Sequence, residues 1–228
     1  MSEAGTAARP QRLPPGRHKL TREQVRESQR RRLLSAAAAE LAEHGYGAIT
    51  VTAVAAGAEV STATLYKRFD GLWDCLLAAY EAGTDRLCGE IELACAAAGE
   101  DARAAAGIAR GLALLAAEPA LANLLLTVPP SNAVALGQAR ARLAERLAAL
   151  LRSARHGPAA EDDRELPAIA GALALASIQL RSGGPLTDLA PTLAQVLLGP
   201  APGGRRRSPQ PATSQVRTRE PVSTVPSR

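Results

Sequence analysis

The chain has 228 residues with a net charge of +5, and 46% of its residues are hydrophobic although only 2% are aromatic. A core built from Ala, Leu, Val and Ile favours helices, so the composition predicts an all-α protein. The longest nearly apolar run, residues 168–180, is shorter than the ~20 residues that a membrane span requires, which argues against a membrane protein.

The basic residues concentrate at the two ends of the chain. Residues 1–32 carry nine Arg or Lys against three Glu, and residues 199–228 carry six Arg against one Glu, on a body with an acidic excess. This pattern indicates a polyanionic partner, although charged tails that keep an aliphatic protein in solution explain it equally well. Their Pro-, Gly- and Arg-rich composition predicts that residues 1–20 and 200–228 are disordered arms.

The start of the chain lacks the apolar segment of a secretory signal, and its cysteines lack CxxC spacing. We therefore expect a cytoplasmic protein with reduced thiols and no membrane partner. Cys75, Cys88 and Cys95 are best explained as small buried hydrophobes, and a redox sensor is the alternative.

Apolar residues at helical spacing, with capping residues before them, predict three helices in the first third of the chain. Thr21, Thr50 and Ser61 are the expected N-caps, and "HGYG" is the expected end of the first helix. The second and third helices are short and joined by about three residues, which is typical of a helix-turn-helix unit. The three helices are expected at residues 21–44, 51–57 and 62–69, within a domain of residues 21–71.

The pattern of the remaining residues, 72–199, predicts a helical body. Its fifth helix is apolar almost all round between Ile169 and Ile178, so we expect it to be buried on several sides and to pack against its copy in a second subunit. With the last helix it would form a four-helix dimer interface. The body helices are expected near residues 72–95, 102–116, 119–127, 131–154, 162–182 and 187–198.

The stretch "VSTATLYKRF", residues 60–69, has the features of a helix that enters the major groove of DNA. Such a helix needs small, hydrogen-bonding residues in its first turn and phosphate-binding groups beside it. Leu65 and Phe69 would face the core. An ordinary amphipathic helix shares these features, so the stretch alone leaves both interpretations open. The candidate DNA contacts are Thr62, Ala63, Thr64, Tyr66, Lys67 and Arg68.

The longer segment of residues 30–80 resembles the N-terminal DNA-binding domain of TetR/AcrR-type transcriptional regulators. The resemblance rests on an alanine-rich helix ending in "EHGY", on Thr50 before "VTAVA", and on "VSTATLYKRF" at the same spacing. It implies a three-helix head with residues 62–69 as the recognition helix. It further implies base contacts from Thr62, Ala63 and Thr64, phosphate contacts from Tyr66 and Lys67, and a backbone contact from Thr50.

Two positions depart from the family pattern. Glu59 stands where the turn often has glycine, which costs roughly 1 kcal/mol if that residue adopts a positive φ; we expect the turn to survive this cost. Leu72 replaces a common lysine and removes one expected phosphate contact. We expect the basic first helix to restore part of this affinity for DNA through phosphate contacts of its own. A solvated helix face explains its cations equally well. These cations are Arg22, Arg26, Arg30, Arg31 and Arg32; the "RRR" of residues 205–207 is the weaker candidate.

The resemblance also implies a homodimer that binds palindromic operator DNA and a small-molecule effector held in the body. We therefore interpret the chain as a ligand-responsive transcriptional regulator, most simply a repressor. A small-molecule binding protein with a vestigial DNA-binding head is the alternative, with Glu59 and Leu72 as signs of the loss. The scarcity of aromatic residues favours an aliphatic effector. The few polar candidates for its contacts are Asn123, Thr127, Asn132, Arg140, Ser177, Gln179 and Arg181.

Nothing in the sequence indicates catalysis, a metal site or a cofactor, so an enzyme is the least supported interpretation. His18, His44 and His156 have no nucleophile or carboxylate arranged beside them. The chain has no Walker loop, no GxGxxG after a strand and no Cys/His cluster. The acidic "EDDRE" of residues 161–165 is explained better as the first turn of a helix than as a metal site.

Overall fold

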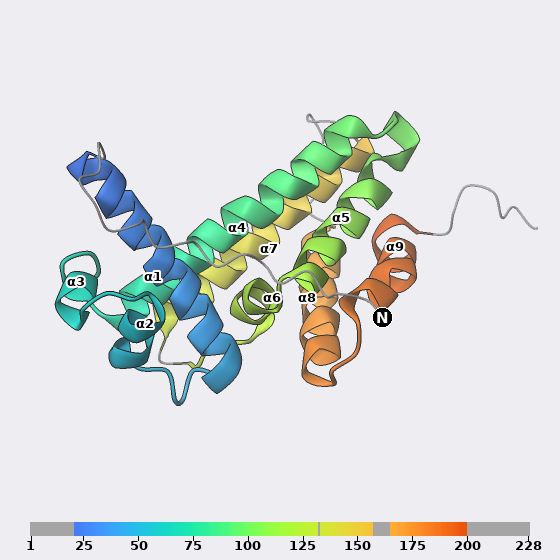
Figure 1. The fold of residues 1–228 in the computed structure, drawn as a ribbon. Coiled ribbons are helices and arrows are strands. Elements are labelled where there is room, and N and C mark those ends of the chain that lie inside the picture. The colour runs from blue at the N-terminus through green and yellow to red at the C-terminus, as the bar shows by residue number, and fades with distance from the viewer. Residues whose placement is uncertain (1–20, 132, 157–164, 200–228) are drawn as a thin grey trace, which may run out of the picture.

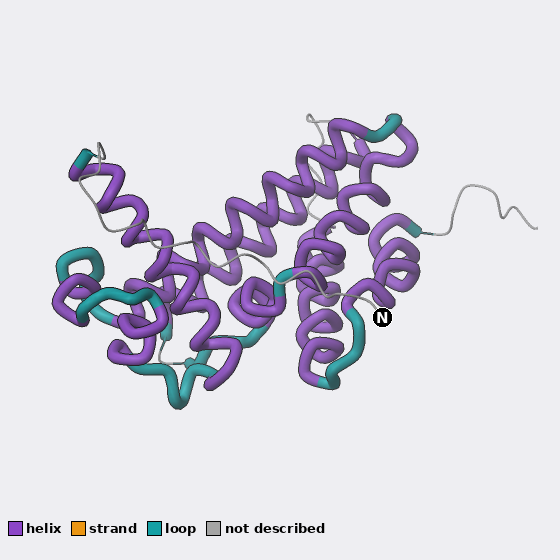
Figure 2. Tube along the Cα trace, viewed as in Figure 1, coloured by secondary structure: helices purple, strands orange, loops and turns teal. Residues whose placement is uncertain are grey.

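The computed structural model describes residues 21–131, 133–156 and 165–199. Within these ranges every regular element is a helix, which confirms the predicted all-α class (Figure 2). The expected arms, the "RRR" of residues 205–207, His18, Asn132 and most of "EDDRE" lie outside the described residues. The helices are α1 Arg22–His44, α2 Val51–Gly57, α3 Thr62–Tyr66, α4 Leu72–Ala97, α5 Arg103–Ala117, α6 Pro119–Leu126, α7 Val134–His156, α8 Glu165–Arg181 and α9 Ala190–Leu198, with 3-10 turns at Glu100–Ala102 and Leu186–Leu189.

Helix α1 begins and ends where its capping residues predict. Thr21 Oγ1 accepts the backbone N–H of Gln24 at 3.2 Å, and Gln24 Oε1 accepts the N–H of Thr21 at 2.9 Å, which satisfies two free donors of the first turn. Gly45 ends the helix with a φ of 69°, a conformation that glycine adopts without a steric penalty.

The turn between α2 and α3 has four residues, 58–61, close to the expected length of about three. Glu59 adopts a φ of 52°, and it is the one non-glycine residue with a positive φ in the described part of the chain. Arg32 of α1 lies close beside it, with 3.8 Å between Arg32 Nη1 and Glu59 Oε2. The turn therefore forms despite the missing glycine, as the sequence predicted, and its strain is roughly 1 kcal/mol.

The prediction that α3 continues to Phe69 is wrong, because the helix ends at Tyr66. Lys67 is the C-cap, and the N–H of Arg68 bonds to the carbonyl of Leu65 three residues back, so the last turn tightens. Phe69 still reaches the core and is buried. Residues 67–69 therefore follow the helix as a turn while keeping the predicted burial.

The molecule is elongated, with a head of α1, α2 and α3 at one end (Figure 1). Helix α4 runs from the head along the length of the body with α7 beside it, and α5, α6, α8 and α9 complete the body. A continuous core links the two parts. Its most deeply buried large side chains include Leu33, Val54 and Leu65 in the head and Leu76, Tyr80, Leu125 and Leu143 further along the chain.

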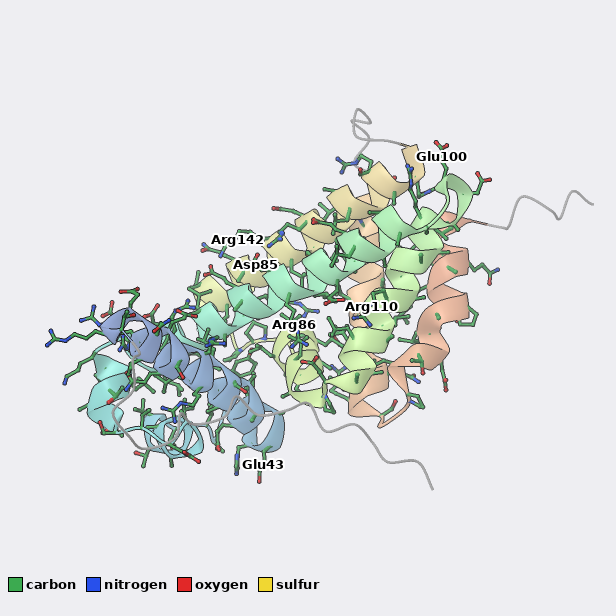
Figure 3. All side chains as sticks on the ribbon, turned by 45° about the horizontal axis from the view of Figure 1, so that its top comes forward. Glu43, Asp85, Arg86, Glu100, Arg110 and Arg142 are labelled. Carbon is green, nitrogen blue, oxygen red and sulfur yellow. The ribbon has the colours of Figure 1, made fainter. Side chains whose placement is uncertain are left out.

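Ion pairs connect α4 to three neighbouring helices. Arg142 and Arg146 of α7 contact Glu81 and Asp85 of α4, at 3.4 Å and 2.6 Å. Two further pairs, Arg110 with Glu90 and Arg86 with Glu118, join α4 to α5 and to the start of α6. Figure 3 labels Asp85, Arg86, Arg110 and Arg142 along this surface. Because the arginine of each pair is about half exposed to solvent, each pair contributes at most about 1 kcal/mol.

The close packing of α4 against α6 depends on Gly83. A Cβ at Gly83 would lie 2.8 Å from Leu121 Cδ1 and 3.5 Å from Leu125 Cδ2, so Gly83→Ala should lower the free energy of unfolding by about 1–3 kcal/mol. Gly137→Ala is the matched control, because Gly137 is exposed on α7 with open space around it; this change should raise stability by about 0.5–1 kcal/mol. Denaturant unfolding measures both, and a Gly83→Ala protein as stable as the wild type would contradict the packing argument.

The three cysteines are free, as predicted, and two of them, Cys75 and Cys88, are buried. Burial raises the pKa of the Cys75 thiol to about 12 and also raises the pKa values of Cys88 and Cys95. All three thiols are therefore protonated at neutral pH, and a protonated thiol is a poor nucleophile. This supports their interpretation as small packing residues.

Candidate DNA-binding face and effector cavity

The outer surface of α3 presents the small and polar residues that the sequence singled out. Thr62, Ala63 and Lys67 are exposed, and Tyr66 is 60% exposed although it is aromatic. Leu65, with no exposed surface, holds the helix from below. Ser61 caps the helix by accepting the N–H of Thr64 at 3.2 Å. The helix thus offers a small first turn, followed by a phenol and an ammonium group, on one accessible surface.

Two of the predicted hydroxyl contacts are already used in capping. Thr50 Oγ1 accepts the N–H of Ala53 at 3.1 Å and fixes the start of α2. The hydroxyls of Thr64 and Ser61 lie 2.9 Å apart at the start of α3, and Thr64 is only half-exposed. Both residues therefore have a structural role that is independent of any bound partner.

The predicted basic contacts separate into two groups. Arg30 is exposed on α1, as are Arg22, Arg26 and Arg31. Arg68, by contrast, is half-buried and turned toward α1, where its Nη2 donates to Gln29 Oε1 at 3.0 Å. The structure thus places Arg68 between the end of α3 and α1, where it helps to fix the orientation of α3.

The body contains an apolar cavity of about 110 Å³ that is partly open to solvent. It extends along α4 from Leu87 to Cys95, where the rise of 1.5 Å per residue gives a length of about 12 Å. Gly107 and Gly111 let α5 approach α4 closely along this wall. The remaining lining is aliphatic and comes from α5 and four more helices, including Leu126 of α6, Leu151 of α7, Ile169 and Ala176 of α8, and Leu193 of α9.

None of the described polar residues that sequence reasoning offered as ligand contacts lines this cavity. Asn123, Thr127, Arg140, Ser177, Gln179 and Arg181 all lie elsewhere, and neither Trp73 nor Tyr80 reaches the lining. One sequence feature could have located the cavity wall: the glycine pair Gly107 and Gly111 in α5, which faces the apolar residues of α4. A cavity of this composition has no stacking partner for a planar aromatic ligand and suits an aliphatic one.

The outward side of α8 is apolar, and no part of the described chain covers it. Ile178 is 55% exposed and Leu175 is also exposed, with no charged residue between Glu165 and Arg181. Val196 of α9 is exposed as well. An exposed surface formed by residues of this kind marks a site of interaction with another molecule. We refer to this surface, formed by Ala170, Gly171, Ala174, Leu175, Ile178 and Val196, as the α8–α9 face.

The described residues form no cluster suited to a metal ion and no single membrane-spanning helix. No group of three or more His, Cys, Asp or Glu side chains there is placed to hold a metal ion. No single described helix is long and apolar enough to cross a membrane, although Glu100–Ala117 and Pro119–Leu126 together pass that test as a pair bent by 112°.

The N-terminal part of the chain matches a known protein family. Residues 33–79 match the model for bacterial regulatory proteins of the tetR family. This range contains α2, α3 and the second half of α1, and therefore most of the predicted DNA-contacting residues. No curated protein matches the sequence of the chain.

Solved structures with a similar fold include several transcriptional regulators. The fatty acid degradation regulator FadR from Bacillus halodurans has a TM-score of 0.62 at 20% identity, covering 74% of this chain and 97% of its own. FadR from Bacillus subtilis, solved in complex with stearoyl-CoA, gives 0.60 at 20% identity, covering 74% and 98%. A TetR-like regulator from Rhodococcus sp. RHA1 gives 0.55 at 24% identity, covering 83% and 100%.

Proposed function

Because the chain has a tetR-family head on the helical fold of TetR-type transcriptional regulators, we propose that it is a ligand-responsive repressor that binds a palindromic operator as a homodimer. The observation that carries this proposal is the outer surface of α3, with small residues in its first turn and an exposed tyrosine and lysine after it. Genomic-fragment selection with the purified protein, followed by footprinting, tests it by identifying the operator.

The exposed residues of α3 have the distribution that groove reading requires. Thr62 and Ala63 are small enough for the first turn to approach base edges, and the Tyr66 hydroxyl and Lys67 ammonium lie where phosphates would flank it. Thr50 and Arg30 would add backbone contacts from α2 and α1. Thr64 would contact a base at the edge of this surface, and Arg68 would act by holding α3 against α1.

Tyr66→Phe and Lys67→Ala should each weaken operator binding at fixed salt by about 1 kcal/mol per head, because each removes a hydrogen-bond donor to a phosphate. Lys67→Ala should also lower the steepness of the salt dependence by about one unit for each head in the complex. Fluorescence anisotropy of labelled operator over a range of salt concentrations measures both effects.

Arg142→Ala is the matched control for these changes, because Arg142 is an exposed cation on the body, paired with Glu81 of α4. It should leave the affinity and the salt slope unchanged. Wild-type affinity in both head variants would remove the assignment of Tyr66 and Lys67 as a phosphate clamp.

The α8–α9 face supports the proposed homodimer. In a two-fold dimer the same face of each subunit meets its copy, so α8 and α9 from two chains would form a four-helix interface. Burial of Leu175, Ile178 and Val196 against their copies would remove exposed apolar surface from water. The dimer would hold the two heads at the spacing of successive major grooves, about 34 Å apart.

The effector that suits the cavity is an aliphatic molecule. A cavity of about 110 Å³ is smaller than the ~150 Å³ apolar cavity that is known to accommodate benzene, so a longer chain must either extend through the open side or move the surrounding helices apart. Such movement would favour a conformation with different head spacing and lower operator affinity. The stearoyl-CoA bound to Bacillus subtilis FadR, which shares the fold, is an effector with a long aliphatic chain and supports the same chemical class.

The alternative of a vestigial head receives less support. Glu59 is accommodated in the turn, and the exposed residues of α3 match those expected of a recognition helix. Leu72 is half-buried at the start of α4 and packs against the core, so it has a structural reason to be apolar.

A further inference from the structure

The C-terminal end of α6 is held by side chains from three other helices. Arg140 Nη1 of α7 donates to the carbonyl oxygens of Leu125 and Leu126, at 3.1 Å and 3.3 Å. Tyr80 Oη of α4 lies 3.4 Å from the first of these oxygens, and Ser177 Oγ of α8 lies 2.6 Å from the second. We call these three side chains and two carbonyls the α6 junction.

The α6 junction satisfies groups that the helix leaves free. The last carbonyls of an α-helix have no partner within the helix and carry its partial negative charge, so a cation is the most favourable donor to them. Arg140 is the one cation among the three donors and the one donor that contacts both carbonyls. It therefore contributes the strongest interactions of the group.

The α6 junction also lies between the cavity and the head. On one side, Leu126 lines the cavity, as does Ala176, the neighbour of Ser177 in α8. On the other side, α6 packs against α1 of the head. Any ligand that displaces Leu126 must therefore move carbonyls that Arg140 holds.

The head is also close to Arg140 through Tyr46, in the loop between α1 and α2. Burial raises the pKa of Tyr46 and raises the pKa of Tyr80 to about 12, and at both phenols the charge of Arg140 acts in the opposite direction. Tyr46 stacks on Trp73 at the start of α4, with 6.1 Å between ring centroids. Arg140 thus acts on residues at both sides of the boundary between head and body.

We propose that Arg140 is the positioning residue that transmits occupancy of the apolar cavity to the head, by tying the C-terminal carbonyls of α6 to α7. The inference rests on the proposed aliphatic effector. When a chain in the cavity pushes Leu126, Arg140 carries the displacement of α6 into α7 and α4 instead of letting the end of α6 move alone. The loop at Tyr46 and the start of α4 then shift with respect to each other.

The chain contains one tryptophan, Trp73, so its fluorescence reports on this boundary alone. The experiment titrates the full-length protein with 1-decanol and with decanoate, measures binding by calorimetry, and records Trp73 emission in the same samples. The variants are Arg140→Met, which keeps an unbranched apolar stem but removes the guanidinium and both of its hydrogen bonds, and Arg140→Lys, which keeps the charge. Arg142→Met, two residues away on the same helix and paired with Glu81, is the control.

In the wild type and in Arg142→Met, binding of at least one probe should change Trp73 emission. Arg140→Met should bind the same probe within about threefold, and its emission change should fall to less than half of the wild-type change; Arg140→Lys should recover most of it. If Arg140→Met does not fold, Arg140→Gln replaces it with the same expectations.

Two results would overturn the inference. If Arg140→Met binds the probe and gives the full emission change, transmission does not depend on Arg140, and the proposed function stands. If neither probe binds the wild type, the aliphatic effector class fails and this inference fails with it. Comparison of decanoate with 1-decanol distinguishes a ligand that needs its carboxylate for binding from a ligand that binds through its apolar part alone.

Discussion

Leu65→Ala should abolish operator binding by destabilising the head rather than by removing a contact to DNA. Leu65 has no exposed surface and joins α3 to the core beneath it, so its truncation leaves a cavity in the smallest packed unit of the molecule. Large-to-small changes at such positions cost about 2–5 kcal/mol. Because α3 has only five residues, it has little stability apart from this packing.

Denaturant unfolding, followed by circular dichroism and Trp73 fluorescence, measures this loss, and operator binding is measured on the same samples. Tyr66→Ala, at the next position, is the control: Tyr66 is exposed, so its removal should change stability by less than about 0.5 kcal/mol while still weakening DNA binding. A Leu65→Ala protein that unfolds at the wild-type denaturant concentration would contradict the buried anchor.

Ile178→Glu should convert the proposed dimer into monomers and lower operator affinity with it. Ile178 lies on the uncovered α8–α9 face and is 55% exposed, and a two-fold interface would bury the new carboxylate in both subunits without a partner. An unpaired buried charge costs about 3–5 kcal/mol, and the two copies act together. In a monomer, binding of one head no longer raises the effective concentration of the second head at the neighbouring groove, so operator affinity falls.

Analytical ultracentrifugation over a range of concentrations measures the association state, and anisotropy measures operator binding. Leu93→Glu is the matched control, because Leu93 is 68% exposed on α4 and is not part of the α8–α9 face. It should remain dimeric. If Ile178→Glu sediments as the wild type does, the dimer uses another surface or does not form.

Much of the head follows from local sequence rules. Thr21, Thr50 and Ser61 cap their helices because each hydroxyl reaches a backbone N–H three residues further on, an interaction that depends on neighbouring residues alone. The end of α1 at Gly45 is equally local. The burial of Leu65 and Phe69 followed from helical periodicity. These features required no knowledge of distant contacts.

The early end of α3 and the orientation of Arg68 could not be read from the sequence in the same way. Periodicity extends through residue 69, yet the chain turns after Tyr66. From its neighbours in the sequence, Arg68 is simply one more cation beside α3. Its actual partner, Gln29, is 39 residues away in α1. Only the packing of the two helices determines that this guanidinium is held inside the head.

In the body, the sequence by itself determined the helical class, the approximate helix boundaries and the unusual apolarity of α8, because each depends on composition and spacing within a single segment. The packing of the helices, by contrast, settles that the cavity lining is apolar apart from the Cys95 thiol, and that Arg140 and Ser177, which sequence reasoning offered as ligand contacts, bond to the end of α6 instead. The physical reason is that a cavity and a helix-end junction are each formed by side chains from several helices far apart in the chain, whose meeting no local pattern records.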